Sequence, residues 1–200
     1  MPDTPLKLGS PWHEFLTEID EHLTAPTQIT CIGGFVVTNI HGFSRTTGDL
    51  DHVELQSKMP DELHQIAGKG SPLHKRYNLY IDYVGGIVTM PLNFDKRLVE
   101  VPFEFETLRI FITDVYDLIL SKMERNSPKD QADVQFLADK HKLRFSILRT
   151  RFDDELDFIP NRDRHLNTLN FWREWFHDHD DGGAEAVVGD EGDQTHRSGS

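Results

Sequence analysis

An apolar run interrupted by two glycines is the feature that most restricts how this chain can fold. The segment QITCI, residues 28–32, has the apolar and β-branched content of a short strand, and it ends at Gly33-Gly34. The next segment, FVVTNIHG (35–42), is β-branched enough for a strand, but the glycine break indicates a turn followed by a helix. Both interpretations stay open, and the helix is favoured only if the glycines serve a site.

The composition is that of a globular protein in a reducing compartment. The chain has 200 residues, of which 37% are hydrophobic and 28% charged, enough for one domain or for a small domain with an appended helical part. No apolar run approaches the roughly 20 residues that a membrane-spanning helix needs. Residues 1–15 lack the apolar centre of a signal peptide, and Cys31 is the single cysteine, so no intrachain disulfide can form. We therefore expect a cytoplasmic protein that has no membrane partner.

The charge distribution restricts the partners. A formal net charge of −13 argues against broad nucleic-acid binding and against double-stranded DNA, because such binding needs basic residues that neutralise phosphates. Residues 178–200 contain seven acidic residues and one arginine without periodicity, which predicts a disordered acidic tail. Five basic residues of the C-terminal half are compatible with a local RNA-facing patch or with a solvated face: Lys140, Lys142, Arg144, Arg149 and Arg151.

The order of expected elements predicts an α+β protein with a small mixed sheet followed by a helical part. Helical apolar spacing and proline-led starts predict N-terminal helices at 11–23 and 60–68. Alternating or β-branched segments predict strands at 28–32, 49–55, 76–85, 97–105 and 107–114. From Asp114 onward the apolar spacing is helical, with one helix starting at Ser127-Pro128 and the last at Pro160. We therefore expect an α/β core over 1–110, a helical part over 111–177 and a tail over 178–200.

Asp49 and Asp51 are the most specific chemical signal. Residues i and i+2 of a strand point to the same face, so two carboxylates there can share a hard divalent cation, Mg²⁺ or Mn²⁺, with the phosphates of a nucleotide. A glycine pair between a strand and a helix lets a triphosphate approach the backbone N–H groups. Gly33-Gly34 and Asp49-x-Asp51 are therefore candidate walls of one nucleotide site.

Asp82 is the candidate for a third carboxylate. Such a group completes a two-metal site or acts as the base toward an incoming hydroxyl. Asp82 interrupts the predicted strand LYIDYV, where a charge is costly unless it faces solvent, a partner or a metal. An edge strand with a polar face explains it equally well.

An ordered motif in this region resembles the signature of nucleotidyltransferase-fold proteins of the polymerase-beta superfamily: Gly33-Gly34, then Gly42-x-x-Arg45-x-Thr47-x-Asp49-Leu50-Asp51. The chain is similar to small prokaryotic subgroups of uncharacterised nucleotidyltransferases and to the AbiEii-type toxins of toxin–antitoxin systems. Residues 114–138, in which a lysine precedes an arginine and an Asp-x-x-Asp, also look like those subgroups. The resemblance thus spans roughly residues 28–140.

The resemblance implies roles for individual residues. It places Gly33 and Gly34 at the triphosphate, Asp49 and Asp51 on Mg²⁺, and Lys122 against phosphate charge. Further residues have more than one role open to them.

Arg45 either touches phosphate or pins the loop before the metal-binding strand. Asp130 and Asp133 lie on one helical face; they hold Lys122 or Arg125 in place, or Asp133 belongs to the nucleotide site. A solvated helix face with intrahelical ion pairs is the alternative for both aspartates.

These features predict a Mg²⁺-dependent enzyme that transfers a nucleoside monophosphate from an NTP to a hydroxyl of RNA, tRNA included, or of a protein. A place in a toxin–antitoxin or defence system follows from the resemblance. The alternative is a catalytically inactive nucleotide-binding or protein-interaction module that docks a cognate partner protein. Two other residues near the motif are expected to be structural, since Cys31 lies in an apolar strand and His52 points to the face opposite Asp51.

Overall fold

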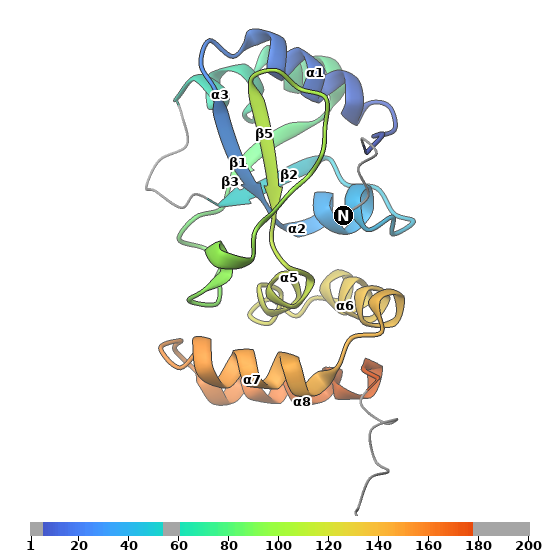
Figure 1. Ribbon diagram of the computed structural model, residues 1–200, viewed down its shortest axis with the longest axis vertical. Coiled ribbons are helices and arrows are strands. Elements are labelled where there is room, and N and C mark those ends of the chain that lie inside the picture. The colour runs from blue at the N-terminus through green and yellow to red at the C-terminus, as the bar shows by residue number, and fades with distance from the viewer. Residues whose placement is uncertain (1–5, 54–60, 178–200) are drawn as a thin grey trace, which may run out of the picture.

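The computed structural model describes residues 6–53 and 61–177. Its centre is a five-stranded sheet in the order β3-β2-β1-β5-β4. Figure 1 shows this sheet between helices drawn above it and helices drawn below it. The strands are β1 (Thr27–Cys31), β2 (Asp49–Val53), β3 (Tyr80–Tyr83), β4 (Val99–Glu100) and β5 (Leu108–Ile112). The pairs β1–β5 and β2–β3 are parallel, whereas β1–β2 and β4–β5 are antiparallel. This mixed sheet, followed in the chain by helices, confirms the expected α+β class.

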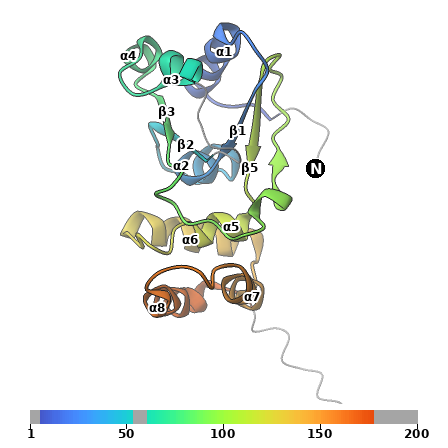
Figure 2. The same ribbon diagram turned by 90° about the vertical axis from the view of Figure 1, so that its left-hand side faces the viewer.

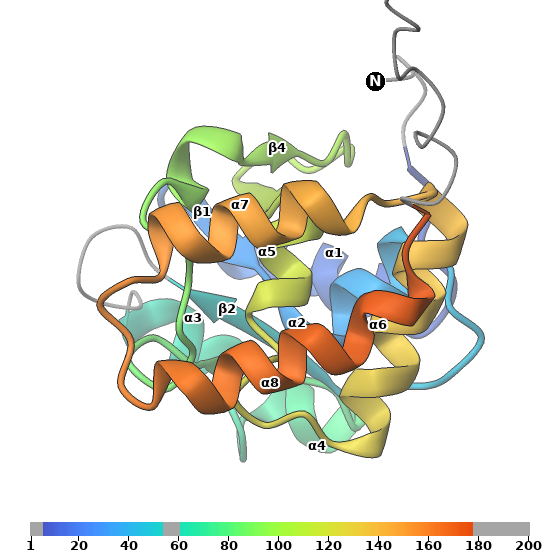
Figure 3. The same ribbon diagram turned by 90° about the horizontal axis from the view of Figure 1, so that it is seen from below.

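Helices lie beyond both ends of the sheet, as Figure 2 shows. One group, drawn at the top, consists of α1 (Trp12–His22), α3 (Asp61–Ala67) and α4 (Pro72–Tyr77). At the opposite end, α5 (Val115–Leu120) and α6 (Pro128–His141) form a first tier. Below them, α7 (Phe145–Glu155) and α8 (Arg162–Trp172) run side by side as a second tier (Figure 3). There are also two 3-10 turns, η2 (Phe94–Arg97) and η3 (Arg173–Trp175).

The segment after the glycine pair is helical, which decides between the two interpretations left open above. It consists of α2 (Gly33–Phe35) continued by a π-helical turn, η1 (Val36–Ile40). Val36 and Val37 are fully buried. Burial in the core therefore outweighs the preference of β-branched residues for strands.

Three predicted boundaries are wrong, and the capping of a short helix explains the first of them. The strand expected at 76–85 is limited to Tyr80–Tyr83, since Ser71 caps α4 by accepting the His74 backbone N–H and Asn78 ends it at φ +56°. The strand expected at 97–105 shortens to Val99–Glu100. The last helix begins at Arg162 rather than Pro160, after a left-handed Asn161.

Other expected elements agree with the structure. The first helix, the strands around 28–32 and 107–114, and the helices within 60–68 and 127–143 are found within a few residues of their expected limits. Residues 54 and 55 of the strand expected at 49–55, and the expected tail 178–200, lie outside the described residues. Strand β5 crosses the expected boundary at residue 110, and the division into parts stays a prediction. No helix in the described part of the chain has the length and hydropathy that crossing a bilayer requires.

A buried ion cluster joins the helical tiers to the loop between β3 and β4. Arg97 donates two hydrogen bonds to Asp117, at 2.8 and 2.9 Å, and two to Glu155, at 2.9 and 2.8 Å. The Asp117 side chain has no exposed surface and also accepts a hydrogen bond from Arg151 at 2.9 Å. Hydrogen bonds from Arg97 hold the pKa of Glu155 below its ordinary value. The cluster therefore connects η2 with α5 and α7.

We predict that Arg97→Gln lowers the free energy of unfolding by about 2–4 kcal/mol, because it leaves the buried Asp117 carboxylate with one cation fewer. The matched control is Arg109→Gln, which breaks an ion pair to Glu100 whose side chains are 49% and 44% exposed. That control should cost less than about 1 kcal/mol. Urea unfolding of both variants measures the difference, and equal losses would contradict a structural role for the cluster.

Candidate active site

Strands β2 and β3 bring three carboxylates to one face of the sheet. Asp49 and Asp51 lie at i and i+2 of β2, and Asp82 stands next to Asp51 in the parallel register of β2 with β3. Neighbours in a parallel register share a face, so all three carboxylates belong to the same side. Strand β3 is at the edge of the sheet and Asp82 is exposed, as the edge-strand interpretation of this residue expects. The same exposed carboxylate is also the neighbour of Asp51.

The crowding of negative charge shows in the ionisation of Asp51. Burial, together with the charges of Asp49 and Asp82, raises its pKa to about 6, although Lys122 and Arg125 oppose the shift. Thr47 Oγ1 donates a 2.5 Å hydrogen bond to Asp49 Oδ1 and so orients that carboxylate. A bound cation would relieve the repulsion that the three carboxylates create.

Strand β2 lies so close to the start of α2 that position 33 has to be a glycine. The φ of Gly33 is +68°, and a Cβ at this position would lie 2.1 Å from Asp51 Oδ2. Only glycine adopts this conformation without strain and leaves the space that the carboxylate occupies. A Cβ on the neighbouring Gly34 would lie 2.8 Å from Thr47 Oγ1 and 3.3 Å from a guanidinium nitrogen of Arg45. The glycine pair thus allows the loop before β2 to pack against the start of α2.

Arg45 pins that loop to helix α6. Its Nε and Nη2 donate to the two carboxylate oxygens of Asp133, both at 2.8 Å. Lys122 Nζ donates to the same carboxylate at 2.9 Å. The side chains of Asp133 and Lys122 are 1% and 4% exposed. The sequence left several roles open for these residues. The geometry supports an Arg45 that fixes the loop before β2 and an Asp133 that positions Lys122.

Asp130 positions Arg125, as Asp133 positions Lys122. Arg125 donates two hydrogen bonds to the Asp130 carboxylate, at 2.7 and 2.5 Å. Asp130 also accepts the backbone N–H of Ser127 at 3.0 Å, in a capping box that starts α6 after Pro128 takes the first helical position. The same carboxylate that caps the helix thus orients a guanidinium next to Lys122. The solvated-face alternative for Asp130 and Asp133 does not describe these buried carboxylates.

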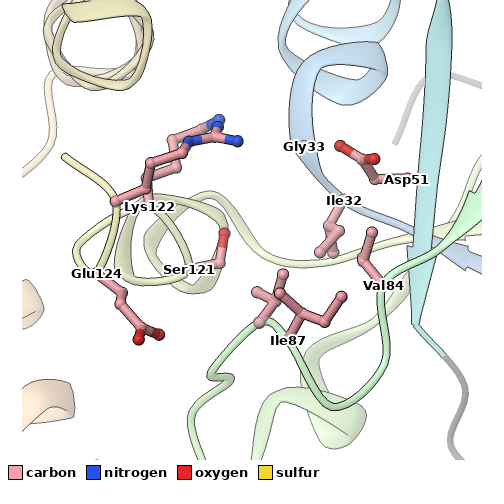
Figure 4. A pocket seen from close by; sticks show the side chains of 10 residues that line it. Ile32, Gly33, Asp51, Val84, Ile87, Ser121, Lys122 and Glu124 are labelled. Atoms are coloured by element: carbon pink, nitrogen blue, oxygen red, sulfur yellow. The ribbon is translucent and has the colours of Figure 1, made fainter. Parts of the chain in front are cut away.

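A cleft of about 280 Å³ separates the carboxylate edge from the segment between α5 and α6. Figure 4 shows Gly33 and Asp51 on one side and Lys122 on the other. Arg125, Ser121 and Glu124 also line the cleft, and in the figure Glu124 points away from Asp51. Its remaining wall is apolar and consists of Ile32, Val84, Ile87 and Val88.

The predicted site residues thus fall into two groups. Gly33, Asp51 and Lys122 line the cleft, and Asp49 and Asp82 adjoin Asp51 on the sheet. The others make contacts within the protein instead: Gly34, Arg45 and Asp133.

Sequence reasoning missed several residues of the cleft. From the sequence, Arg125 is expected only as a partner of the α6 aspartates. Its position three residues after Lys122 is the local sign that it lines the same cleft. The apolar wall was not predicted, and its only local sign is Gly85-Gly86 directly after the strand that carries Asp82.

The donor set at the sheet edge suits a hard cation that a nucleotide helps to hold. Within residues 6–53 and 61–177, no group of three or more His, Cys, Asp or Glu side chains is arranged to hold a metal ion by itself. Mg²⁺ in nucleotide sites commonly takes one or two carboxylates, with phosphates and water as its other ligands. The oxygen-only pair Asp49 and Asp51 fits this arrangement.

Two residues expected to be structural are buried as predicted. Cys31 and His52 have no exposed surface. Burial lowers the pKa of His52 to about 4, so this imidazole is neutral at pH 7. Burial, together with the charge of Asp51, raises the pKa of the Cys31 thiol, which makes it a poor nucleophile. Neither residue carries the chemistry of the site.

The basic residues of the helical half are largely paired. Lys142 contacts Asp139 at 2.9 Å, and Arg149 contacts Asp153 at 2.5 Å. Arg151 belongs to the Asp117 cluster, and Lys140 donates to the backbone carbonyl of His41. The local excess of positive charge is therefore smaller than the sequence suggests, and an RNA partner stays a prediction.

The fold and the cleft together define a class: an α+β protein in which a carboxylate edge faces a lysine and an arginine across a cleft. Residues 13–181 match the DUF6036 family, described as a nucleotidyltransferase of unknown function, and the chain belongs to this family. Comparisons with curated proteins and with solved structures found no match. The finer resemblance to the polymerase-beta superfamily and to AbiEii-type toxins stays a prediction.

We predict that Gly33→Ala destabilises the fold, since its Cβ would displace the Asp51 carboxylate. Gly70→Ala is the matched control, because Gly70 also has a positive φ, +91°, but nothing lies within 4 Å of its Cβ position. Backbone strain alone should cost about 1–2 kcal/mol at Gly70, and the collision at Gly33 should add about 1–3 kcal/mol. Urea unfolding of both variants tests this; equal losses of stability would show that Asp51 tolerates the change.

The Asp130 carboxylate predicts a defined loss of stability in acid. Burial alone would raise its pKa, but hydrogen bonds from Arg125 and Ser127 outweigh burial and lower the pKa to about 2. A carboxylate whose pKa is depressed by folding stabilises the folded state above its unfolded pKa of about 4, and this contribution is lost as the pH falls toward 2.

Asp130→Asn should therefore lower the free energy of unfolding by about 2 kcal/mol at pH 7, and the deficit relative to wild type should shrink between pH 4 and pH 2. Urea unfolding of both proteins over this range measures it. A deficit that stays constant with pH would show that the charge of Asp130 is not what stabilises the fold.

Proposed function

We propose that this protein is a Mg²⁺-dependent nucleotidyltransferase of the polymerase-beta type, with Mn²⁺ as an alternative ion. It transfers a nucleoside monophosphate from an NTP to a hydroxyl of RNA, tRNA included, or of a protein. One observation carries the proposal: Asp51, flanked by Asp49 and Asp82, lies across a cleft from Lys122 and Arg125. Membership of a family described as nucleotidyltransferases supports it.

The cleft provides opposite charges for the two parts of a metal–nucleotide complex. Lys122 donates to Asp133, and its ammonium has further N–H groups for phosphate oxygens. Arg125 is held by Asp130 and has a side chain that is 69% exposed, so its guanidinium is accessible from the cleft. On the opposite wall, the missing side chain of Gly33 leaves room for the Asp51 carboxylate, which is a candidate ligand of the metal that accompanies the phosphates. These observations support a triphosphate that binds between the Asp51 wall and the two cations.

The transfer step moves the nucleoside monophosphate from the NTP to the acceptor hydroxyl. The acceptor oxygen forms a bond to the α-phosphorus, the bond from that phosphorus to the bridging oxygen of the β-phosphate breaks, and pyrophosphate leaves. Asp82 is exposed beside Asp51 and is the candidate to take the proton of the hydroxyl. Lys122 and Arg125 stabilise the charge that develops on the leaving pyrophosphate. Mg²⁺, when bound at Asp49 and Asp51, supplies further charge neutralisation for the triphosphate.

The resemblance to AbiEii-type toxins supports placing this activity in a cytoplasmic toxin–antitoxin or defence system, with a cognate protein as partner. It does not select the base or the acceptor. The same experiment that tests the activity therefore has to identify both.

Transfer of label from each of the four α-labelled NTPs to total tRNA and to a protein lysate, with Mg²⁺ and then with Mn²⁺, tests the proposal. We expect transfer by the wild type that falls at least 100-fold in Asp49→Asn and in Asp51→Asn, a loss typical of removing a group that stabilises transition-state charge. Glu100→Gln, which changes an exposed carboxylate on β4, is the control and should retain full activity.

The loss cannot be attributed to unfolding if Asp51→Asn is at least as stable as the wild type. This is the expected result without metal, because a pKa raised to about 6 means that the ionised carboxylate destabilises the folded state at pH 7. Absence of transfer with intact Mg-NTP binding would favour the inactive nucleotide-binding module instead. Absence of nucleotide binding would overturn the site itself.

A further inference from the structure

The apolar wall of the cleft is not explained by phosphate or metal chemistry. It consists of Ile32, directly after β1, and of Val84, Ile87 and Val88, from the turn that follows β3. In Figure 4 the side chains of Ile32, Val84 and Ile87 gather at one end of the cleft. Ile87 is 77% exposed, the largest exposed fraction among the large hydrophobic residues reported for the described chain. Water therefore covers an aliphatic side chain at the mouth of a charged site.

The turn that presents Ile87 is held at both ends. At its start, Val84 N–H donates to the His52 carbonyl at 3.0 Å, and Ile87 N–H donates to the Val84 carbonyl at 3.1 Å. Further along, Leu92 N–H donates to the Glu155 carbonyl at 3.2 Å, and Asn93 N–H to the Glu155 carboxylate at 2.9 Å. The Arg97 cluster fixes the same Glu155. A surface that is ordered before binding loses little conformational entropy when a ligand covers it.

The size and polarity of the cleft select the kind of ligand group that covers this wall. The cleft has about 280 Å³, close to the lower limit for sites that hold small molecules, so it suits part of one nucleotide. Its charged end faces Gly33, Asp51, Lys122 and Arg125, whereas its other end offers aliphatic surface. An NTP has the matching division, with a charged triphosphate at one end and the flat, weakly polar faces of a base at the other.

We propose that the turn from Val84 to Val88 is a platform for the nucleobase, with Ile87 packing against the face of the base. This inference rests on the proposed function, because it takes the triphosphate to occupy the charged end. An aliphatic side chain contacts the face of any base and reads none of the polar edges. The platform therefore contributes to affinity for all four NTPs and does not choose among them.

Equilibrium binding of Mg-NTP and of Mg-tripolyphosphate, without acceptor, to wild type and Ile87→Ala tests the platform. We expect Ile87→Ala to weaken each NTP about tenfold, from the loss of buried aliphatic surface, and to leave tripolyphosphate binding unchanged. Leu92→Ala is the matched control, since Leu92 is 60% exposed in the same loop but does not line the cleft; it should change neither affinity. Ile87→Leu should restore NTP affinity to within about threefold of wild type.

Each other outcome overturns the platform, and two of them separate it from the proposed function. If Ile87→Ala leaves NTP affinity unchanged, or weakens NTP and tripolyphosphate equally, Ile87 does not contact the base. If the wild type binds NTP and tripolyphosphate with the same affinity, the base has no subsite although the phosphate site stands. If the wild type binds neither, the proposed function fails together with the platform.

Discussion

The buried contact of Asp133 with Arg45 and Lys122 is the interaction on which the rest of the site depends. It joins the loop that leads into β2 to the helical tier, and it holds the ammonium group that lines the cleft. A carboxylate with 1% exposed surface is costly to bury unless cations and hydrogen bonds compensate it. The same contact that stabilises the junction of sheet and helices therefore also sets the positions of the two charged walls of the cleft, the acidic one on β2 and the basic one that contains Lys122.

Each of the three walls of the cleft also has a local interaction that supports it. Gly33 lets β2 approach α2, the capping box of α6 orients Arg125, and the Arg97 cluster fixes the loop that carries Ile87. Charge of one sign collects on the sheet edge and charge of the other sign on the α5–α6 segment. Such separation is unfavourable within each wall and becomes favourable when a cation and a polyanion bind between them. The arrangement is therefore consistent with a site for a metal–nucleotide complex.

Much of the site could be predicted because its signals are local. The two-residue spacing of Asp49 and Asp51 is enough to place both carboxylates on one face, and a glycine pair at a strand end indicates a close approach. Asp82 was identified as an unusual charge in a strand, but its place beside Asp51 depends on the register of β2 with β3. The short helix α4 was missed because aromatic content after it suggested a longer strand, although Ser71-Pro72 was a capping signal.

The sequence by itself determined the α+β class, the glycine turn, the acidic strand and the helical second half, since each follows from spacing along a few residues. Only the tertiary structure decided that Asp133 serves Arg45 and Lys122, that Arg125 lines the cleft, and that an apolar turn forms its third wall. Arg45 and Asp133 are 88 positions apart, and the choice of partner across such a distance depends on how elements pack. Periodicity specifies which face a residue occupies, but not which residue that face meets.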